Sequence, residues 1–185
     1  MKTKILLALS AILATIGAFA ADSQWTYNST PGTISDGDWT FAATVSGTDL
    51  TVGAVSADPG AGATLDFSKA VTDGSATYTI VTLNPNFAAY ANKTNLTALV
   101  LPATGLITIS TDAFNGCSNL TSISSFLPDS VETIGERAFK SVPAQQDLSL
   151  KGVVTVNKSA FYGCGALSVT FGPGLKLLCG GWESG

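Results

Sequence analysis

A degraded repeat over the second half of the chain constrains the fold more than any other feature of the sequence. Its anchors are four phenylalanines separated by 27, 25 and 22 residues: Phe87, Phe114, Phe139 and Phe161. Spacing of this kind is typical of short solenoid repeats, whose units pack mainly against their neighbours in the chain. One such unit cannot bury its own apolar side chains, so we predict a stack of about four units.

Each unit contains two sets of apolar residues. In the last three units, an aliphatic residue stands five positions before the Phe and a small apolar residue three positions after it: Ile109, Ile134, Val156, Cys117, Val142 and Cys164. The second set recurs with alternating spacing, as at Leu99 and Leu101, and alternation is typical of a strand. We therefore predict one short strand per unit in a parallel sheet, with an irregular or briefly helical return that places the Phe underneath.

The segment Leu127–Phe139 combines Leu-Pro with Ile-Gly-x-x-Ala-Phe, and Cys follows the Phe by three residues in the units of Phe114 and Phe161. From roughly Tyr78 to Leu178 the pattern resembles the BspA-like leucine-rich repeat family of bacterial surface proteins. A repeat matched at several positions is more specific than one short motif. The resemblance implies a leucine-rich repeat solenoid, displayed outside the cell, that binds proteins or surfaces. It does not imply catalysis.

Two positions depart from the family pattern. The unit of Phe87 lacks the Ile-Gly dipeptide, and Gln145 stands where Leu120 stands in the preceding unit. The first departure indicates a transition to a cap, and the second indicates a locally weak point in the stack.

The amino terminus has the features of a secretory signal peptide. Lys2 and Lys4 supply positive charge, the stretch 5–19 is apolar, and Ala18-Phe19-Ala20 offers small residues where a signal peptidase cleaves. The apolar stretch is shorter than the roughly 20 residues that span a bilayer. We therefore predict a signal peptide over residues 1–20, a secreted or cell-surface location, and no membrane span after cleavage.

Residues 21–77 lack the repeat and are predicted to form a β-rich amino-terminal cap. The stretches 39–45 and 50–52 are rich in β-branched and aromatic residues and flank a turn with Gly47, which predicts a hairpin. A cap would cover the open end of the repeats, which otherwise invites edge pairing. The alternative is a separate β module with its own binding face, formed by Trp25, Tyr27 and Trp39.

The repeats are predicted to occupy residues 78–178 and to be followed by an irregular tail, 179–185. Leu178 matches Ile134 in the repeat, but Glu183 stands where the next Phe is expected. We therefore expect a truncated last unit, with Phe171 and Leu175 partly open to solvent.

Composition disfavours several function classes. Without Lys2 and Lys4 the chain has seven basic and thirteen acidic residues, and its only Arg is Arg137. Nucleic-acid binding needs clustered Lys and Arg, so it is disfavoured. The sequence contains no His, which excludes Ser-His and Cys-His nucleophilic pairs and His metal sites. A hydrolase that uses carboxylates alone remains a minor alternative, and no catalytic residue is assigned.

The three cysteines do not suggest a disulfide framework or a metal site. Cys117 and Cys164 occupy equivalent positions two units apart, or about 10 Å at the usual strand spacing, beyond the reach of a disulfide. We interpret both as small core residues. Ser35–Asp38 contains two carboxylates but too few ligands for calcium, so we interpret it as a solvated turn. No metal or cofactor is predicted.

The candidate ligand-binding surface is a concave face made by the outward strand positions of the repeats. The residues predicted to form it are Thr97, Thr121, Ser122, Ser124, Gln146, Asp147, Ser149, Ser168 and Thr170. Such a face offers hydrogen bonds but lacks the Trp, Tyr and Arg anchors of tight interfaces, so we expect modest affinity and adhesion through many copies. The partner would be a protein or an extracellular surface; the alternative is a structural surface-layer or matrix component without a specific ligand.

Overall fold

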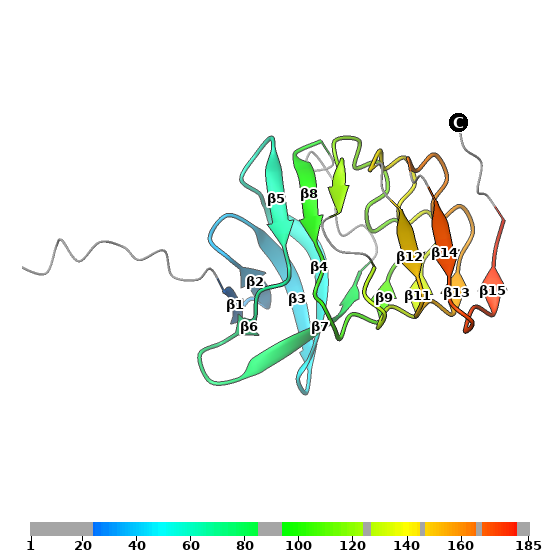
Figure 1. Cartoon of the computed structure of the whole chain (residues 1–185). Helices are drawn as coiled ribbons and strands as arrows, with labels where there is room; N and C mark the ends of the chain where they lie inside the picture. The colour runs from blue at the N-terminus through cyan, green and yellow to red at the C-terminus, as the bar shows by residue number, and fades with distance from the viewer. Residues whose placement is uncertain (1–23, 85–93, 124–126, 145–146, 166–167, 181–185) are drawn as a thin grey trace, which may run out of the picture.

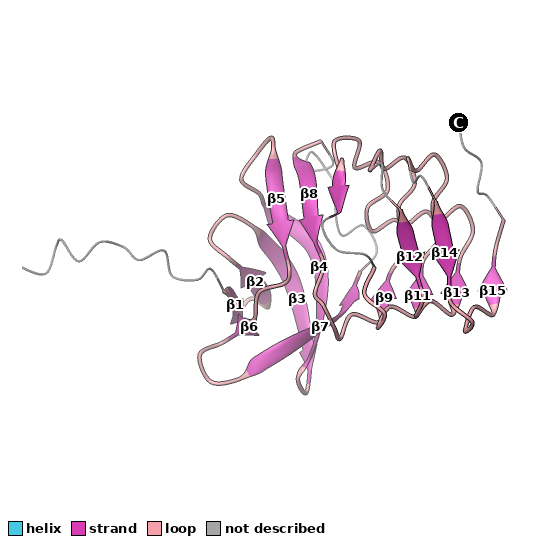
Figure 2. Ribbon diagram, viewed as in Figure 1, coloured by secondary structure: helices cyan, strands magenta, loops and turns pink. Residues whose placement is uncertain are grey.

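The computed structural model describes residues 24–84, 94–123, 127–144, 147–165 and 168–180. Within these ranges the chain forms strands and turns and no helix, as Figures 1 and 2 show. The predicted signal peptide, the anchor Phe87 and the weak point at Gln145 lie outside the described residues. The returns were predicted to be irregular or briefly helical, and in the described part of the chain they are irregular.

The strands of the described ranges are short. They are β1 (Trp25–Asn28), β2 (Thr33–Ser35), β3 (Thr40–Ser46), β4 (Asp49–Ala57), β5 (Ala63–Asp66), β6 (Val71–Thr72), β7 (Thr77–Leu83), β8 (Leu96–Val100), β9 (Thr108–Ile109), β10 (Ser122–Ile123), β11 (Thr133–Ile134), β12 (Leu148–Leu150), β13 (Thr155–Val156), β14 (Val169–Phe171) and β15 (Leu177–Leu178).

Six amino-terminal strands form a closed, barrel-like ring. β1, β2, β3 and β4 pair antiparallel in that order, and β4 pairs parallel with β7. β6 closes the ring by pairing with both β7 and β1. The β-rich character and the hairpin of β3 and β4 were predicted and are confirmed. Ring closure was not predicted, because it depends on the pairing of the two-residue strand β6 with β1, which is distant from it in the sequence.

Aromatic side chains fill the ring. The centroids of Trp25 and Phe67 lie 5.1 Å apart, and those of Trp39 and Phe41 lie 5.7 Å apart with nearly parallel planes. Both tryptophans are buried, with 0% and 3% of their surface exposed. The alternative binding face built on Trp25, Tyr27 and Trp39 is therefore wrong for the two tryptophans, which belong to the core.

A parallel ladder extends this sheet into the repeats. β7 pairs with β9, and β11, β13 and β15 follow in order, each in parallel register with the last. The register places Ile109, Ile134, Val156 and Leu178 in one column, as the repeat alignment predicted. The strand β7 belongs both to the ring and to this ladder, so the two parts share one continuous sheet.

Further parallel strands lie on another side of each repeat. β5, β8 and β10 form one sheet, and β12 and β14 form another. In Figure 1, β5 and β8 lie above the strands of the ring, and β12 and β14 lie above β11 and β13 of the ladder. The prediction of one strand per unit was wrong, since the Thr-Ile or Thr-Val dipeptide before each Phe forms a second, very short strand.

The predicted column of phenylalanines is confirmed at the turn that follows each ladder strand. The rings of Phe114, Phe139 and Phe161 stack with centroids 5.4 Å apart at both steps. Backbone hydrogen bonds join the same turns, since the amide of Phe139 donates to the carbonyl of Ala160 at 2.7 Å. Stacked aromatic rings of this kind contribute beyond the burial of their surface.

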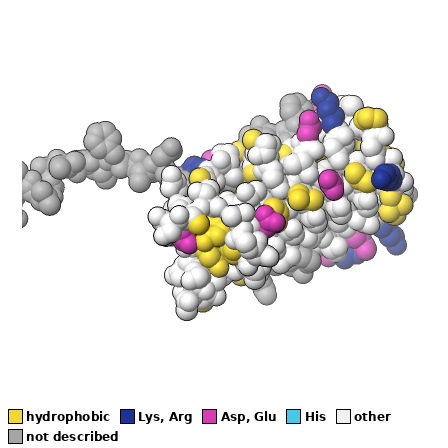
Figure 3. Space-filling model, turned by 90° about the horizontal axis from the view of Figure 1, so that it is seen from below, with side chains coloured by type: hydrophobic (Ala, Val, Ile, Leu, Met, Phe, Trp, Pro, Cys, Tyr) yellow, Lys and Arg dark blue, Asp and Glu magenta, His cyan; other side chains and the backbone are white. Residues whose placement is uncertain are grey.

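Small apolar residues fill the positions behind the phenylalanines. Cys117 and Val142 are fully buried, as predicted, whereas Cys164 is only partly buried. Burial falls toward the last unit: Phe171, Leu177 and Leu178 are among the exposed large apolar residues, and Leu175 is half-buried. The prediction that Phe171 and Leu175 are partly open is confirmed. Figure 3 shows apolar side chains at the surface of this end.

Candidate functional site

The predicted ligand-binding residues lie on the strands β8, β10, β12 and β14 or next to them. Thr121 and Ser122 are exposed, whereas Ile123 beside them is buried. Ser122 pairs in register with Ala98 of β8, and Ala98 pairs with Thr64 of β5. Thr121 and Ser122 are therefore open to solvent, as the sequence indicated.

A second group of predicted residues lies on the other sheet. Ser149 and Thr170 are register partners on β12 and β14. The hydroxyl of Ser168 donates to the carboxylate of Asp147 at 2.6 Å, and both side chains are exposed. This pair presents a carboxylate and a hydroxyl together at the surface.

Not every predicted residue is available for a ligand. Thr97 is half-buried, and its hydroxyl donates to the carbonyl of Ala63 at 3.1 Å, which ties β8 to β5. Ser124 and Gln146 lie outside the described residues. The described members belong to two separate sheets, so they form two hydroxyl-bearing groups within the described ranges.

A row of threonines missed by the sequence analysis crosses the large sheet. Its members are register partners on six adjacent strands: Thr44, Thr51, Thr82, Thr108, Thr133 and Thr155. All six are half-buried or exposed. Three members of the row could have been found from the dipeptide of Thr and a β-branched aliphatic residue that stands six and five positions before Phe114, Phe139 and Phe161. Thr on the outer face of a strand is also explained by β propensity and by cross-strand packing.

One ion pair links neighbouring repeats at the phenylalanine turns. Arg137 forms two hydrogen bonds to the carboxylate of Asp112, each 2.8 Å long, and the planar guanidinium suits this paired geometry. The hydrogen bonds and charge of Asp112 raise the pKa of Arg137. The side chain is also paired with Glu136. Arg137 is therefore engaged within the protein and is not placed as an anchor for a partner.

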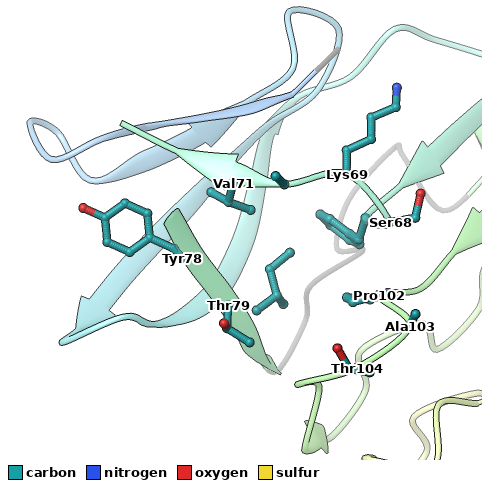
Figure 4. Close-up of a pocket in the computed structure, with 11 residues that line it drawn as sticks. Ser68, Lys69, Val71, Tyr78, Thr79, Pro102, Ala103 and Thr104 are labelled. Atoms are coloured by element: carbon teal, nitrogen blue, oxygen red, sulfur yellow. The ribbon is translucent and has the colours of Figure 1, made fainter. Parts of the chain in front are cut away.

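A cavity of about 280 Å³ lies between the ring and the first repeats (Figure 4). Tyr78 and Thr79 on one side and Pro102–Thr104 on the other contribute to its walls. Figure 4 shows the ends of the Lys69 and Tyr78 side chains pointing away from the centre of this space. The lining residues include Ser68, Lys69 and Tyr78 but no Asp, Glu or Cys.

A second, more acidic cavity of about 480 Å³ lies beside the turn that was considered for calcium. The Asp36 carboxylate accepts the backbone N–H groups of Asp38 at 3.1 Å and Trp39 at 2.8 Å. That carboxylate closes the turn, in line with the interpretation of Ser35–Asp38 as a turn. Within the described ranges, no three His, Cys, Asp or Glu side chains are grouped so as to hold a metal ion.

Tyr78 forms the most strongly perturbed titrating pair of the ring. Its hydroxyl donates to the carboxylate of Asp73 at 2.7 Å. This bond, together with the backbone N–H groups of Ala76 and Ser75, lowers the pKa of Asp73 from 3.8 to about 2. The same bond raises the pKa of Tyr78. The pair closes the turn between β6 and β7, so we interpret it as structural.

Comparison with known families assigns the repeat region. Residues 86–176 match the model of the BspA type leucine rich repeat region, in six copies. No curated protein and no solved structure matches the chain. The described part of the chain contains no helix long and apolar enough to cross a membrane.

Proposed function

Because the chain belongs to the BspA-type leucine-rich repeat family through residues 86–176, we propose that it is a secreted or cell-surface protein that binds protein or surface ligands. The family suggests a bacterial surface protein with a protein-binding role. The finer proposal is adhesion, through a solenoid whose outward strand positions carry small polar side chains. We also propose that the protein acts by binding alone, without catalysis.

The observation that best supports this proposal is the side-chain pattern of β10 and β14. Ser122 on β10 and Thr170 on β14 are exposed, while Ile123 beside Ser122 and Leu148 on the neighbouring β12 are buried. Groups of hydroxyls with Asp147 offer hydrogen-bond donors and acceptors without a large apolar anchor. A single molecule would therefore bind with modest affinity, and many copies on one cell would be needed for firm adhesion.

The amino-terminal ring is proposed to serve as the cap of the repeats. It shares the strand β7 with the ladder, and β5 lies beside β8 of the first repeat. The predicted leader, residues 1–20, would direct the chain out of the cell. Amino-terminal sequencing of protein secreted by a bacterial host would test this part, and the expected first residue is Ala21.

Binding of the mature chain, 21–185, to intact host cells and to a panel of extracellular-matrix proteins tests the proposed function. We expect saturable binding that Ser122→Arg reduces, because an Arg side chain would cover the hydroxyl surface. Thr133→Arg is the matched control, since it introduces the same side chain on β11, which belongs to a different sheet from Ser122. Both variants must give the circular dichroism spectrum of the parent.

Equal loss of binding in both variants, or full binding by Ser122→Arg, would contradict the assignment of ligand binding to the surface around Ser122. No binding by folded protein, together with self-assembly, would instead support the structural surface-layer alternative.

A further inference from the structure

Two tyrosines, Tyr27 on β1 and Tyr78 on β7, form an aromatic corner at one end of the amino-terminal ring. Each stands two positions from a fully or nearly buried residue of its strand, Trp25 or Ile80, so it lies on the inner side of that strand. Both rings pack against the core but keep part of their surface exposed. Their centroids lie 5.0 Å apart and their planes meet at 64°. The two rings therefore make two walls of an angled, partly open site.

The carboxylate of Asp73 lies beside this corner and keeps room for a further hydrogen bond. Its Oδ1 accepts the backbone N–H groups of Ser75 and Ala76, each at 2.8 Å, and its Oδ2 accepts the hydroxyl of Tyr78 at 2.7 Å. An ionised carboxylate has about four acceptor positions, so Oδ2 can take one more donor. Asp73 is exposed, and the hydrogen bonds that it accepts lower its pKa to about 2. The group is therefore negatively charged at neutral pH.

The surrounding ring is acidic. Residues 24–84 contain six Asp and one basic residue, Lys69. Lys69 is paired with Asp66 at 4.0 Å, and Figure 4 shows the side chains of Lys69 and Tyr78 pointing in different directions. Figure 3 shows an apolar patch on the underside of the ring, with acidic side chains on two sides of it. The basic residue of this stretch is therefore engaged elsewhere and does not neutralise the corner.

Aromatic rings beside a carboxylate suit a cation, and the geometry favours a guanidinium group. A guanidinium is planar and weakly hydrated, so it can lie on a Tyr ring and donate an N–H group to a carboxylate at the same time. The single position left on Oδ2 of Asp73 suits one such N–H. The net negative charge of residues 24–84 repels the phosphates of nucleic acids and of anionic membranes. A basic segment of a protein is the complementary partner.

We propose that Tyr27, Tyr78 and Asp73 form a docking site for an arginine side chain of a partner protein. The guanidinium lies against the aromatic corner and donates one N–H group to Oδ2 of Asp73. The other carboxylates of the ring attract the basic segment that carries this arginine. The inference goes beyond the proposed function, in which the ring serves only as a cap, and it places a partner on a surface separate from that around Ser122.

NMR titration of the full mature chain, 21–185, with a short peptide tests the proposal. The probe is Gly-Ser-Arg-Gly-Ser-Arg-Gly-Ser, and its control is the same peptide with citrulline at both Arg positions, which keeps the shape but removes the charge. We expect saturable chemical-shift changes at the rings of Tyr27 and Tyr78 and at the Asp73 carboxyl. Binding should weaken as salt is raised, since screening acts on exposed charges. The citrulline peptide should bind at least about tenfold more weakly.

Matched variants locate the site. Tyr27→Leu should weaken binding of the arginine peptide by about threefold or more, because it removes one aromatic wall. Tyr162→Leu is its control, since Tyr162 is 40% exposed on the repeats. Asp73→Asn should weaken binding by about tenfold, because it keeps an oxygen for the turn amides but removes the charge. Asp129→Asn, at an exposed site on the repeats, is its control. Ser122→Arg should leave peptide binding unchanged, so failure of the hydroxyl surface and failure of this site are distinguishable.

Three results would overturn the proposal: no saturable change at the two tyrosine rings of folded protein, equal binding of the citrulline peptide, or equal effects of Tyr27→Leu and Tyr162→Leu. The first two need only the parent chain, so they decide the matter even where a variant fails to fold. Shifts of the same rings on dilution of the free chain, without peptide, would assign the corner to a second copy and would also overturn it.

Discussion

At the scale of single residues, the chain relies on local hydrogen bonds to close its turns. Asp36 accepts the backbone amides of its own turn, and Asp73 accepts amides and the hydroxyl of Tyr78. Asp and Asn are favoured in turns because their side chains can bond the backbone a few residues on. Asp residues that favour turns can be recognised in a sequence, but only the structure shows that the hydroxyl of Tyr78 donates to Asp73.

The Asp73 pair predicts a defined pH dependence. The folded pKa, about 2, is below the value of 3.8 for an unperturbed Asp. The stability that this carboxylate contributes is therefore present above pH 3.8 and is lost as the pH falls toward 2. Tyr78→Phe should raise the pKa of Asp73 toward 3.8, measured by carboxyl ¹³C NMR titration. Tyr162→Phe is the distant control; an unchanged titration in Tyr78→Phe would show that the phenol does not hold the pKa down.

At the scale of elements, the structure shows why the repeats stack in register. The phenylalanine column, the Ile and Val column and the row of threonines all advance by one strand per unit. A slip by one residue would turn each buried Ile outward and each Thr inward, so the pattern of the sequence specifies the register strongly. The phenylalanine spacing alone predicted this column correctly.

The edge of β5 leads to a prediction about the two tryptophans. Trp39→Phe keeps most of the ring but removes the N–H that bonds the carbonyl of Thr64. Leaving this carbonyl without its donor should lower the free energy of unfolding by about 1–2 kcal/mol, in addition to the effect of the smaller ring. Chemical denaturation measures the change, with Tyr27→Phe as the control because its hydroxyl has no hydrogen bond to a described residue. A Trp39→Phe protein as stable as the control would contradict the role assigned to the indole.

At the scale of the whole molecule, we expect the local stability of the repeats to fall from the centre of the stack toward the last unit. The amides of Gly135 and Cys179 donate to equivalent carbonyls, at 2.7 Å and 2.9 Å. However, Gly135 lies within the buried centre of the stack, whereas the strand before Cys179 is exposed. Repeats gain stability from each neighbour that they contact.

Native-state hydrogen exchange tests this gradient directly. The amides of Gly135 and Asn157 should exchange more slowly than that of Cys179, because they open only with the centre of the stack. The amide of Ala63, at the capped edge of β5, is the control and should be protected more than that of Cys179. Equal protection along the whole ladder would contradict the predicted gradient.

The sequence by itself determined the repeat, its register and its family, because a pattern of Phe, Ala, Ile and Leu at fixed offsets can be buried in only one way when units stack. It also determined the strand-rich character of the amino-terminal segment and the hairpin of β3 and β4, since their signals are local. Only the tertiary structure decided the closure of the six-strand ring, the second short strand of each unit and the burial of both tryptophans. These depend on pairing between segments distant in the sequence, such as β6 with β1, and a two-residue strand is too short to leave a periodic signal in the sequence. The hydrogen bonds that cover the edge of β5 were likewise decided by where the indoles of Trp25 and Trp39 lie in space, which composition and spacing do not specify.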